Sequence, residues 1–154
     1  MNTMSDLYYK LKWSIENFFK YFRIVSRMRP WDFNYLLEMF QFQLKLLKEY
    51  IEKYGIEIDK TRLQKVERME KVIELLDNFL KDDYSERCGY NCKAYKINFV
   101  KLPNKELYEM VRKKQLGFKD YDENKIFKNS YKLEEKEWNE LFDILKSDLK
   151  GWWD

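Results

Sequence analysis

The chain has 154 residues, 37% of them charged and 18% aromatic, with thirty Lys and Arg against twenty-seven Asp and Glu. A chain of this length buries about 68–70% of its extended surface, which predicts one soluble domain over residues 1–154. Because the sequence has no histidine, mechanisms that need imidazole as a base, a proton shuttle or a zinc ligand are excluded. The net charge of +3 does not by itself indicate nucleic acid.

Three amphipathic helices are predicted in the first half of the chain, from apolar residues that recur every three or four positions. They cover residues 6–28, 31–54 and 59–82, and Gly55 stops the second. Because the turn after Gly55 is short, the second and third helices should form an antiparallel hairpin.

The second helix is apolar over most of its circumference. A narrow polar stripe is all that is left for water, and it comprises Asn34, Glu38, Gln41, Lys45, Lys48 and Glu52. A helix of this kind is buried on several sides. We therefore expect it at the centre of a bundle or in an oligomer interface.

The second half of the chain has a different pattern. A β or loop insert is expected near 90–102, where Tyr95, Ile97 and Phe99 alternate with polar residues. A helix over 104–116, a loop over 118–130 and a last helix after Ser130 should follow. The fold class is thus mainly α, a compact helical bundle around the central antiparallel hairpin.

The clearest charge cluster lies between the first two helices. It comprises Lys20, Arg23, Arg27 and Arg29, with no acidic residue from Lys20 to Trp31. Guanidinium groups bind phosphates, and interleaved aromatic rings such as that of Trp31 can stack on a base. The cluster is therefore a candidate site for an anionic, base-bearing ligand. The alternative is a solvated basic edge whose aromatic side chains point inward.

Catalytic and metal-binding motifs are not found. The pairs Asp82–Asp83 and Asp120–Asp122 lie at helix ends or in polar loops without a converging ligand set, so we expect structural roles for them. There is no glycine-rich phosphate loop, and no Ser or Cys has a neighbouring base. Cys88 and Cys92 match neither redox nor zinc spacing, and free thiols are expected. The sequence predicts no enzyme, no metal and no cofactor.

Two features bear on location and partners. No apolar run approaches the ~18–20 residues that a bilayer requires, and the first residues lack the pattern of a secretory signal, so we expect a cytosolic protein without a membrane span. Trp152 and Trp153 stand near the end of the sequence. They are either a hydrophobic anchor for the last helix or a candidate interface, because Trp is enriched at binding hot spots.

Several segments together carry a resemblance. They are Arg29-Pro30-Trp31-Asp32-Phe33-Asn34-Tyr35-Leu36-Leu37, Val72-Ile73-Glu74-Leu75-Leu76-Asp77, Asp82-Asp83-Tyr84 and Trp152-Trp153-Asp154. The chain resembles a widespread set of small tailed-phage proteins that share an Arg-x-Trp-Asp-x-x-Tyr-Leu-Leu core, a Leu-Leu-Asp segment and a Trp-Trp-Asp end. Residues 85–130 do not take part in this resemblance. Relatives have His, Trp and Gly after the acidic-Tyr ending, where this chain reads Ser85-Glu86-Arg87-Cys88-Gly89-Tyr90.

The resemblance implies a function. The chain is similar to anti-CBASS sponges, oligomers that sequester cyclic nucleotide immune signals without cleaving them. A homo-oligomer in the host cytoplasm is then expected, with Arg27 and Arg29 on phosphates, supported by Lys20 and Arg23, and with Trp31 or Tyr35 stacked on a base. The alternative is a module that inhibits or bridges a host or phage protein. Duplex DNA is the less favoured ligand, because the net charge is only +3.

Overall fold

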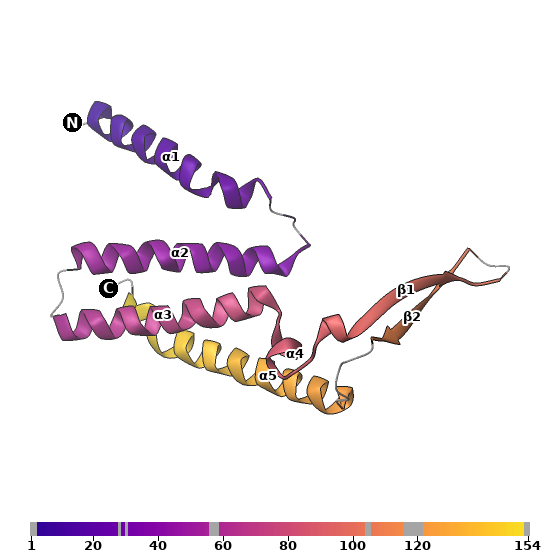
Figure 1. Cartoon of the computed structure of the whole chain (residues 1–154). Coiled ribbons are helices and arrows are strands. Elements are labelled where there is room, and N and C mark those ends of the chain that lie inside the picture. Colours follow the sequence, from indigo (N-terminus) through magenta and orange to yellow (C-terminus); the bar gives the residue numbers. More distant parts are fainter. Residues whose placement is uncertain are drawn as a thin grey trace. The chain divides into compact units, whose positions relative to one another are not determined.

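The computed structural model describes residues 3–27, 29, 31–55, 59–103, 106–115 and 122–152. The fold is mainly helical, with one two-stranded antiparallel sheet (Figure 1), and the predicted class is confirmed at that level. Two compact units make up the chain: Met1–Leu80 with Asp148–Asp154, and Lys81–Ser147. A compact bundle and a single domain over 1–154 stay predictions.

The first unit contains the three predicted helices, α1 (Thr3–Val25), α2 (Phe33–Tyr54) and α3 (Asp59–Lys81). Asp32 caps α2, because its Oδ1 accepts a hydrogen bond of 3.0 Å from the backbone N–H of Asn34. Gly55 ends the helix, and its N–H donates to the Ile51 carbonyl at 2.9 Å. A Cβ at Gly55 would lie 2.5 Å from that oxygen, so the turn requires glycine.

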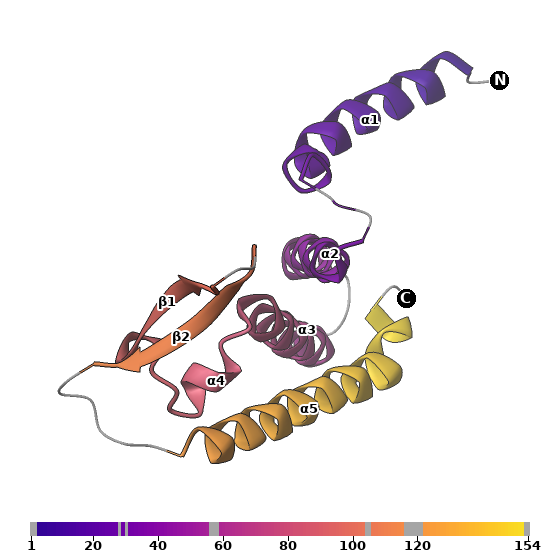
Figure 2. The same ribbon diagram turned by 90° about the vertical axis from the view of Figure 1, so that its right-hand side faces the viewer.

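Helices α2 and α3 lie side by side in opposite directions, as the short turn predicts (Figures 1 and 2). Three contacts along their length establish this arrangement. The Gln41 side chain donates to the Ile73 carbonyl at 3.0 Å, Lys48 pairs with Glu70 at 2.8 Å, and Arg62 donates to the Gly55 carbonyl at 3.4 Å. The buried apolar residues of the pair are Leu37, Leu44, Ile51, Val66, Met69, Val72, Leu75 and Leu76.

The prediction that the polar stripe of α2 faces water is confirmed at Asn34, Lys45 and Glu52, which are exposed, and wrong at Gln41. Gln41 is only 6% exposed, and Lys48 reaches across to α3. Three residues of the predicted apolar surface of this helix, Phe33, Leu36 and Tyr50, are exposed as well. The stripe can face its neighbour because its polar groups are paired: Gln41 bonds to the Ile73 carbonyl and to Lys45, which offsets the cost of removing it from water.

The C-terminal end of α1 approaches α2, whereas the N-terminal turns of α1 diverge from α2 (Figures 1 and 2). The Tyr21 hydroxyl donates to the Gln43 side chain. The ring of Tyr21 packs edge-on against Phe42, with centroids 5.2 Å apart. Of the α1 side chains from Asp6 to Val25, all but Tyr21 and Ile24 are exposed.

The second unit begins with the short helix α4 (Tyr84–Arg87) and the 3-10 turn η1 (Cys92–Ala94). A β-hairpin follows, formed by β1 (Tyr95–Lys101) and β2 (Tyr108–Lys114). Tyr95 pairs with Lys114 at one end and Lys101 with Tyr108 at the other. The β insert is therefore present where the alternation of apolar and polar residues predicts it.

The predicted helix over 104–116 is wrong in its described part, because residues 108–114 form β2. Leu107, Met110 and Val111 fit a helical spacing, but Tyr108 and Met110 also alternate with polar residues, as strand residues do. Pairing with β1 decides between the two, since it satisfies backbone groups that a lone strand would leave open. Residues 104–105 and 116–121 lie outside the described residues.

The last helix also begins earlier than predicted. Helix α5 spans Glu123–Asp148, so the predicted loop is wrong from residue 123 onward and Ser130 lies inside the helix. Asp122 provides the start signal that the pattern analysis missed, because its Oδ1 accepts a hydrogen bond of 3.1 Å from the Lys125 N–H. The Ser130 hydroxyl donates to the Phe127 carbonyl at 2.8 Å, which satisfies it within the helix.

A buried polar cluster joins α4 to α5 within the second unit. Glu137 is 8% exposed and accepts hydrogen bonds from the Tyr84 hydroxyl, at 3.0 Å, and from the Arg87 guanidinium. Burial, and then the hydrogen bond to Glu137, raise the pKa of Tyr84. The hydrogen bond to Glu137 is also the main cause that raises the pKa of Arg87. The carboxylate therefore holds a neutral phenol and a charged guanidinium.

Candidate functional site

The candidate site lies where the end of α1 faces α2, within the first unit. A pocket of about 280 Å³ opens there, which we call the basic pocket. Its lining consists of Lys20, Arg23, Ile24, Arg27, Glu38, Gln41, Phe42 and Lys45. Four of these side chains are cations and one is a carboxylate, so the lining attracts anions.

Helix α1 and the turn after it place three of the cations. Lys20, Arg23 and Arg27 stand three and four positions apart, the spacing that puts residues on one side of a helix. The Arg27 Nε donates to the Arg23 carbonyl at 3.1 Å, near the helix end, and the Ser26 hydroxyl donates to the same oxygen at 3.3 Å. The first bond holds the Arg27 guanidinium beside Arg23.

Helix α2 contributes the other wall. Lys45 donates to the Gln41 Oε1 at 2.9 Å, and Gln41 is fixed in turn by its bond to the Ile73 carbonyl. Glu38 accepts from Arg27 at 3.3 Å. Both partners of this ion pair are partly exposed, so solvent screens it and it contributes little to stability.

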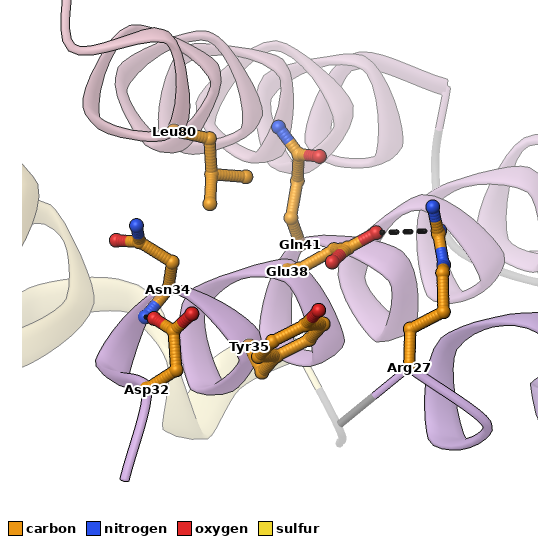
Figure 3. Close-up of a pocket in the computed structure, with 7 residues that line it drawn as sticks. All are labelled: Arg27, Asp32, Asn34, Tyr35, Glu38, Gln41 and Leu80. Atoms are coloured by element: carbon orange, nitrogen blue, oxygen red, sulfur yellow. Dashed lines mark hydrogen bonds and ion pairs between the residues drawn. The ribbon is translucent and has the colours of Figure 1, made fainter. Parts of the chain in front are cut away.

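A second pocket, of about 400 Å³, adjoins the basic pocket and shares Arg27, Glu38 and Gln41 with it. We call it the Tyr35 pocket. Figure 3 shows its lining, which also includes Asp32, Asn34, Tyr35 and Leu80. Its charged lining residues are Arg27 and the carboxylates of Asp32 and Glu38, so this pocket has no excess positive charge to attract a phosphate. It offers instead an aromatic ring and several hydrogen-bond acceptors.

The structure brings together some of the predicted ligand residues and separates others. Lys20, Arg23 and Arg27 share the basic pocket, and Tyr35 lines the adjoining one. Arg29 and Trp31 line neither, and Trp31 is 79% exposed. The binding roles of all these residues stay predictions. The geometry supports a shared site for the pocket-lining residues and does not include Arg29 or Trp31 in it.

The two tryptophans at the end of the sequence also differ in what can be said of them. Trp152 belongs to the 3-10 turn η2 (Lys150–Trp152) and is 4% exposed, which is the placement expected of a hydrophobic anchor. Its backbone N–H donates to the Leu149 carbonyl at 3.4 Å. Trp153 lies outside the described residues. A role in an interface stays a prediction for both.

Sequence reasoning missed the α2 wall of the basic pocket. Glu38, Gln41 and Lys45 stand three and four positions apart on the polar stripe of α2, and the stripe itself was the available signal. Three aligned polar residues on an otherwise apolar helix mark either a solvated edge or a polar contact with a neighbour. The pattern alone does not distinguish the two.

Other candidates for chemistry are few among the described residues. They hold no cluster of three or more His, Cys, Asp or Glu suited to a metal ion. Cys88 and Cys92 are free thiols. Asp122 is a helix cap, and Asp120 lies outside the described residues. Among the described helices, none is long and apolar enough to span a membrane.

The combined site has the dimensions and chemistry of a small-molecule site. Ligand pockets measure about 300–1,000 Å³; the Tyr35 pocket, at about 400 Å³, lies in this range, and the basic pocket, at about 280 Å³, lies just below it. One half is cationic, and the other carries an aromatic ring with polar acceptors. Comparison of the chain with protein-family models, curated proteins and solved structures found no match.

Proposed function

We propose that this protein binds and sequesters a cyclic nucleotide without cleaving it, with phosphates in the basic pocket and a base in the Tyr35 pocket. The observation that carries the proposal is the convergence of Lys20, Arg23, Arg27 and Lys45, from two helices, on one pocket. Four cations against one carboxylate, that of Glu38, favour a ligand that brings its own negative charge.

Phosphate binding in the basic pocket depends on the hydrogen-bond partners of Arg27. Its guanidinium is held at one edge by the Arg23 carbonyl and pairs with Glu38 through another nitrogen. A phosphate can replace Glu38, because guanidinium groups form paired hydrogen bonds with phosphate oxygens. Binding therefore requires a rotation of the Glu38 side chain and no change of the backbone.

The base half rests on Tyr35 and its neighbours. Stacking of a base on an aromatic ring is worth about 1–3 kcal/mol. The carboxylates of Asp32 and Glu38 accept hydrogen bonds, so the pocket favours a base edge that presents N–H donors. Asp32 already accepts from the Asn34 N–H, which fixes its carboxylate in place.

The biological setting is part of the same proposal and rests on the resemblance to small tailed-phage proteins. Asp32 and Tyr35, which line the Tyr35 pocket, belong to the Arg-x-Trp-Asp-x-x-Tyr core of that resemblance. In this account the protein is a phage product that acts in the host cytoplasm as a homo-oligomeric anti-CBASS sponge. Sequestration then needs affinity and no catalytic group.

A thermal-shift screen of the full chain tests the proposal. The probes are cyclic di- and trinucleotides, with ATP and inorganic phosphate for comparison. We expect one cyclic nucleotide to raise the melting temperature by several degrees, because a ligand of the native state stabilises it by mass action. Chromatography after denaturation should return that nucleotide intact. A cleaved product would make the protein an enzyme, and no shift with any probe would contradict the proposal.

A protein-binding module is the second candidate function. It is favoured by the apolar side chains that α1 exposes, among them Leu11, Phe18 and Phe22, since large apolar patches mark interaction surfaces. Nucleotides should then leave the melting temperature unchanged. DNA binding is less favoured, and affinity that falls steeply with salt would indicate it.

A further inference from the structure

Helix α1 carries an uninterrupted heptad seam that stays exposed in the described part of the first unit. The seam residues recur at alternating steps of three and four, and they are Tyr8, Leu11, Ile15, Phe18, Phe22 and Val25. Each of the six is between 52% and 65% exposed. Tyr21, which contacts α2, and the buried Ile24 both lie outside the seam.

We propose that the seam pairs with the seam of a second copy of this chain as a two-stranded coiled coil. A 3.5-residue repeat is the period at which two helices wrap around each other, with each seam side chain inserted between side chains of the other helix. A face with this repeat is complementary to itself. The proposal is independent of nucleotide binding.

The charges beside the seam favour a second copy. Lys12 is the one charged residue among the flanking positions from Leu7 to Tyr21, which also include Ser14 and Phe19. In a parallel pair, the position of Lys12 faces that of Leu7 in the other copy. Like charges therefore do not meet across the interface, whereas the partner-specifying charge pairs of heteromeric coiled coils are missing.

The exposed area is sufficient for association. Three of the six seam residues are aromatic, and aromatic side chains bury large areas, so the seam offers on the order of 700 Å² for each helix. A standard interface buries about 800 Å² per partner, and the flanking Leu7 and Phe19, 59% and 73% exposed, enlarge the patch. The contact is thus close to the size of a specific dimer interface.

Two variants of α1 form a matched pair for the test. Phe18 lies in the seam and Trp13 lies on the opposite side of the helix, yet both rings are 60% exposed. Phe18→Glu and Trp13→Glu therefore place the same charge at equally exposed sites of one helix. Because both sites are exposed, neither change should unfold the monomer, and circular dichroism checks this.

Sedimentation velocity of the full chain over a range of concentrations measures the outcome. We expect the wild type and Trp13→Glu to have twice the mass of the chain, and Phe18→Glu to have the mass of one chain. If Phe18→Glu loses helical signal, Leu11→Glu, two helical turns earlier in the seam, replaces it. A wild type that stays monomeric, or an equal loss of dimer in both variants, overturns the proposal. A monomeric wild type that floats with anionic phospholipid vesicles would assign the seam to lipid instead.

Discussion

Among single residues, the buried Gln41 and Glu137 are satisfied in networks that a linear pattern does not reveal. Gln41 links α2 to the α3 backbone and orients Lys45. Glu137 holds Tyr84 and Arg87 although the three come from separate segments. A buried carboxylate with two charge-assisted or phenolic donors is strongly coupled to its partners, so removal of one partner exposes the others to an unfavourable environment.

Tyr84→Phe tests the network through its pH dependence. The pKa of Tyr84 is raised above its ordinary value of 10.0, so the folded chain keeps a proton that the unfolded chain releases as the pH rises past that value. This contribution to the free energy of unfolding is therefore fully present at neutral pH. Above the ordinary pKa it falls by at most about 1.4 kcal/mol for each pH unit. Tyr84→Phe has no phenol and so lacks this pH-dependent contribution.

Urea unfolding of both proteins at neutral and alkaline pH measures the difference. At neutral pH we expect Tyr84→Phe to be less stable by about 1 kcal/mol, the usual contribution of a hydrogen bond. The gap in the free energy of unfolding should narrow as the pH rises above 10.0. Two curves that stay parallel across that range would contradict the account of Tyr84.

At the scale of elements, the sequence predicted best where a strong periodicity met a clear boundary. Helix α2 has a long apolar pattern, a capping Asp32 and a terminal Gly55, and its bounds agree with the prediction within two residues. The predicted helix over 104–116 had boundary signals in Asn104 and Gly117, but its periodicity was weak, since Met110 fits the helical and the strand period alike. Pairing with β1 makes residues 108–114 a strand, and the local sequence pattern gives no information about that pairing.

The candidate site also has a part that the sequence predicted and a part that it did not. The cations on the α1 side were predictable because four basic residues stand together without an acid. Their separation was not, since Arg29 follows the end of α1 by four residues and its direction depends on the turn. The α2 wall was hidden because Glu38 and Gln41 look like solvent-facing residues until the position of α1 is known.

The cap of α5 gives a prediction at this scale. Asp122→Ala removes the side-chain acceptor of the Lys125 N–H and should lower the free energy of unfolding by about 1 kcal/mol. Asp122→Asn keeps a good capping side chain and serves as the control. Urea denaturation of the three proteins measures the effect. Equal losses in both variants would mean that Asp122 acts through its charge and not as a cap.

In the molecule as a whole, α1 of the first unit carries two distinct surfaces, the apolar seam and the cations of the basic pocket. The seam of α1 faces away from α2, whereas Lys20, Arg23 and Arg27 turn toward it. Association through the seam therefore leaves the basic pocket of each copy accessible. Under the proposed function, each copy would then keep its own binding site, which suits sequestration, where capacity matters more than turnover.

In the proposed function, the basic pocket binds the nucleotide, and the basic run of the sequence as such does not. Arg23 and Arg29 are both exposed, but only Arg23 lines the pocket. Calorimetric titration of Arg23→Ala, Arg29→Ala and the wild type with the cyclic nucleotide that shifts the melting temperature compares them directly. We expect Arg23→Ala to weaken binding roughly tenfold or more, as the loss of a charge-assisted hydrogen bond does, and Arg29→Ala to match the wild type. An equal loss in both variants, or a loss in Arg29→Ala alone, would contradict the assignment of the site.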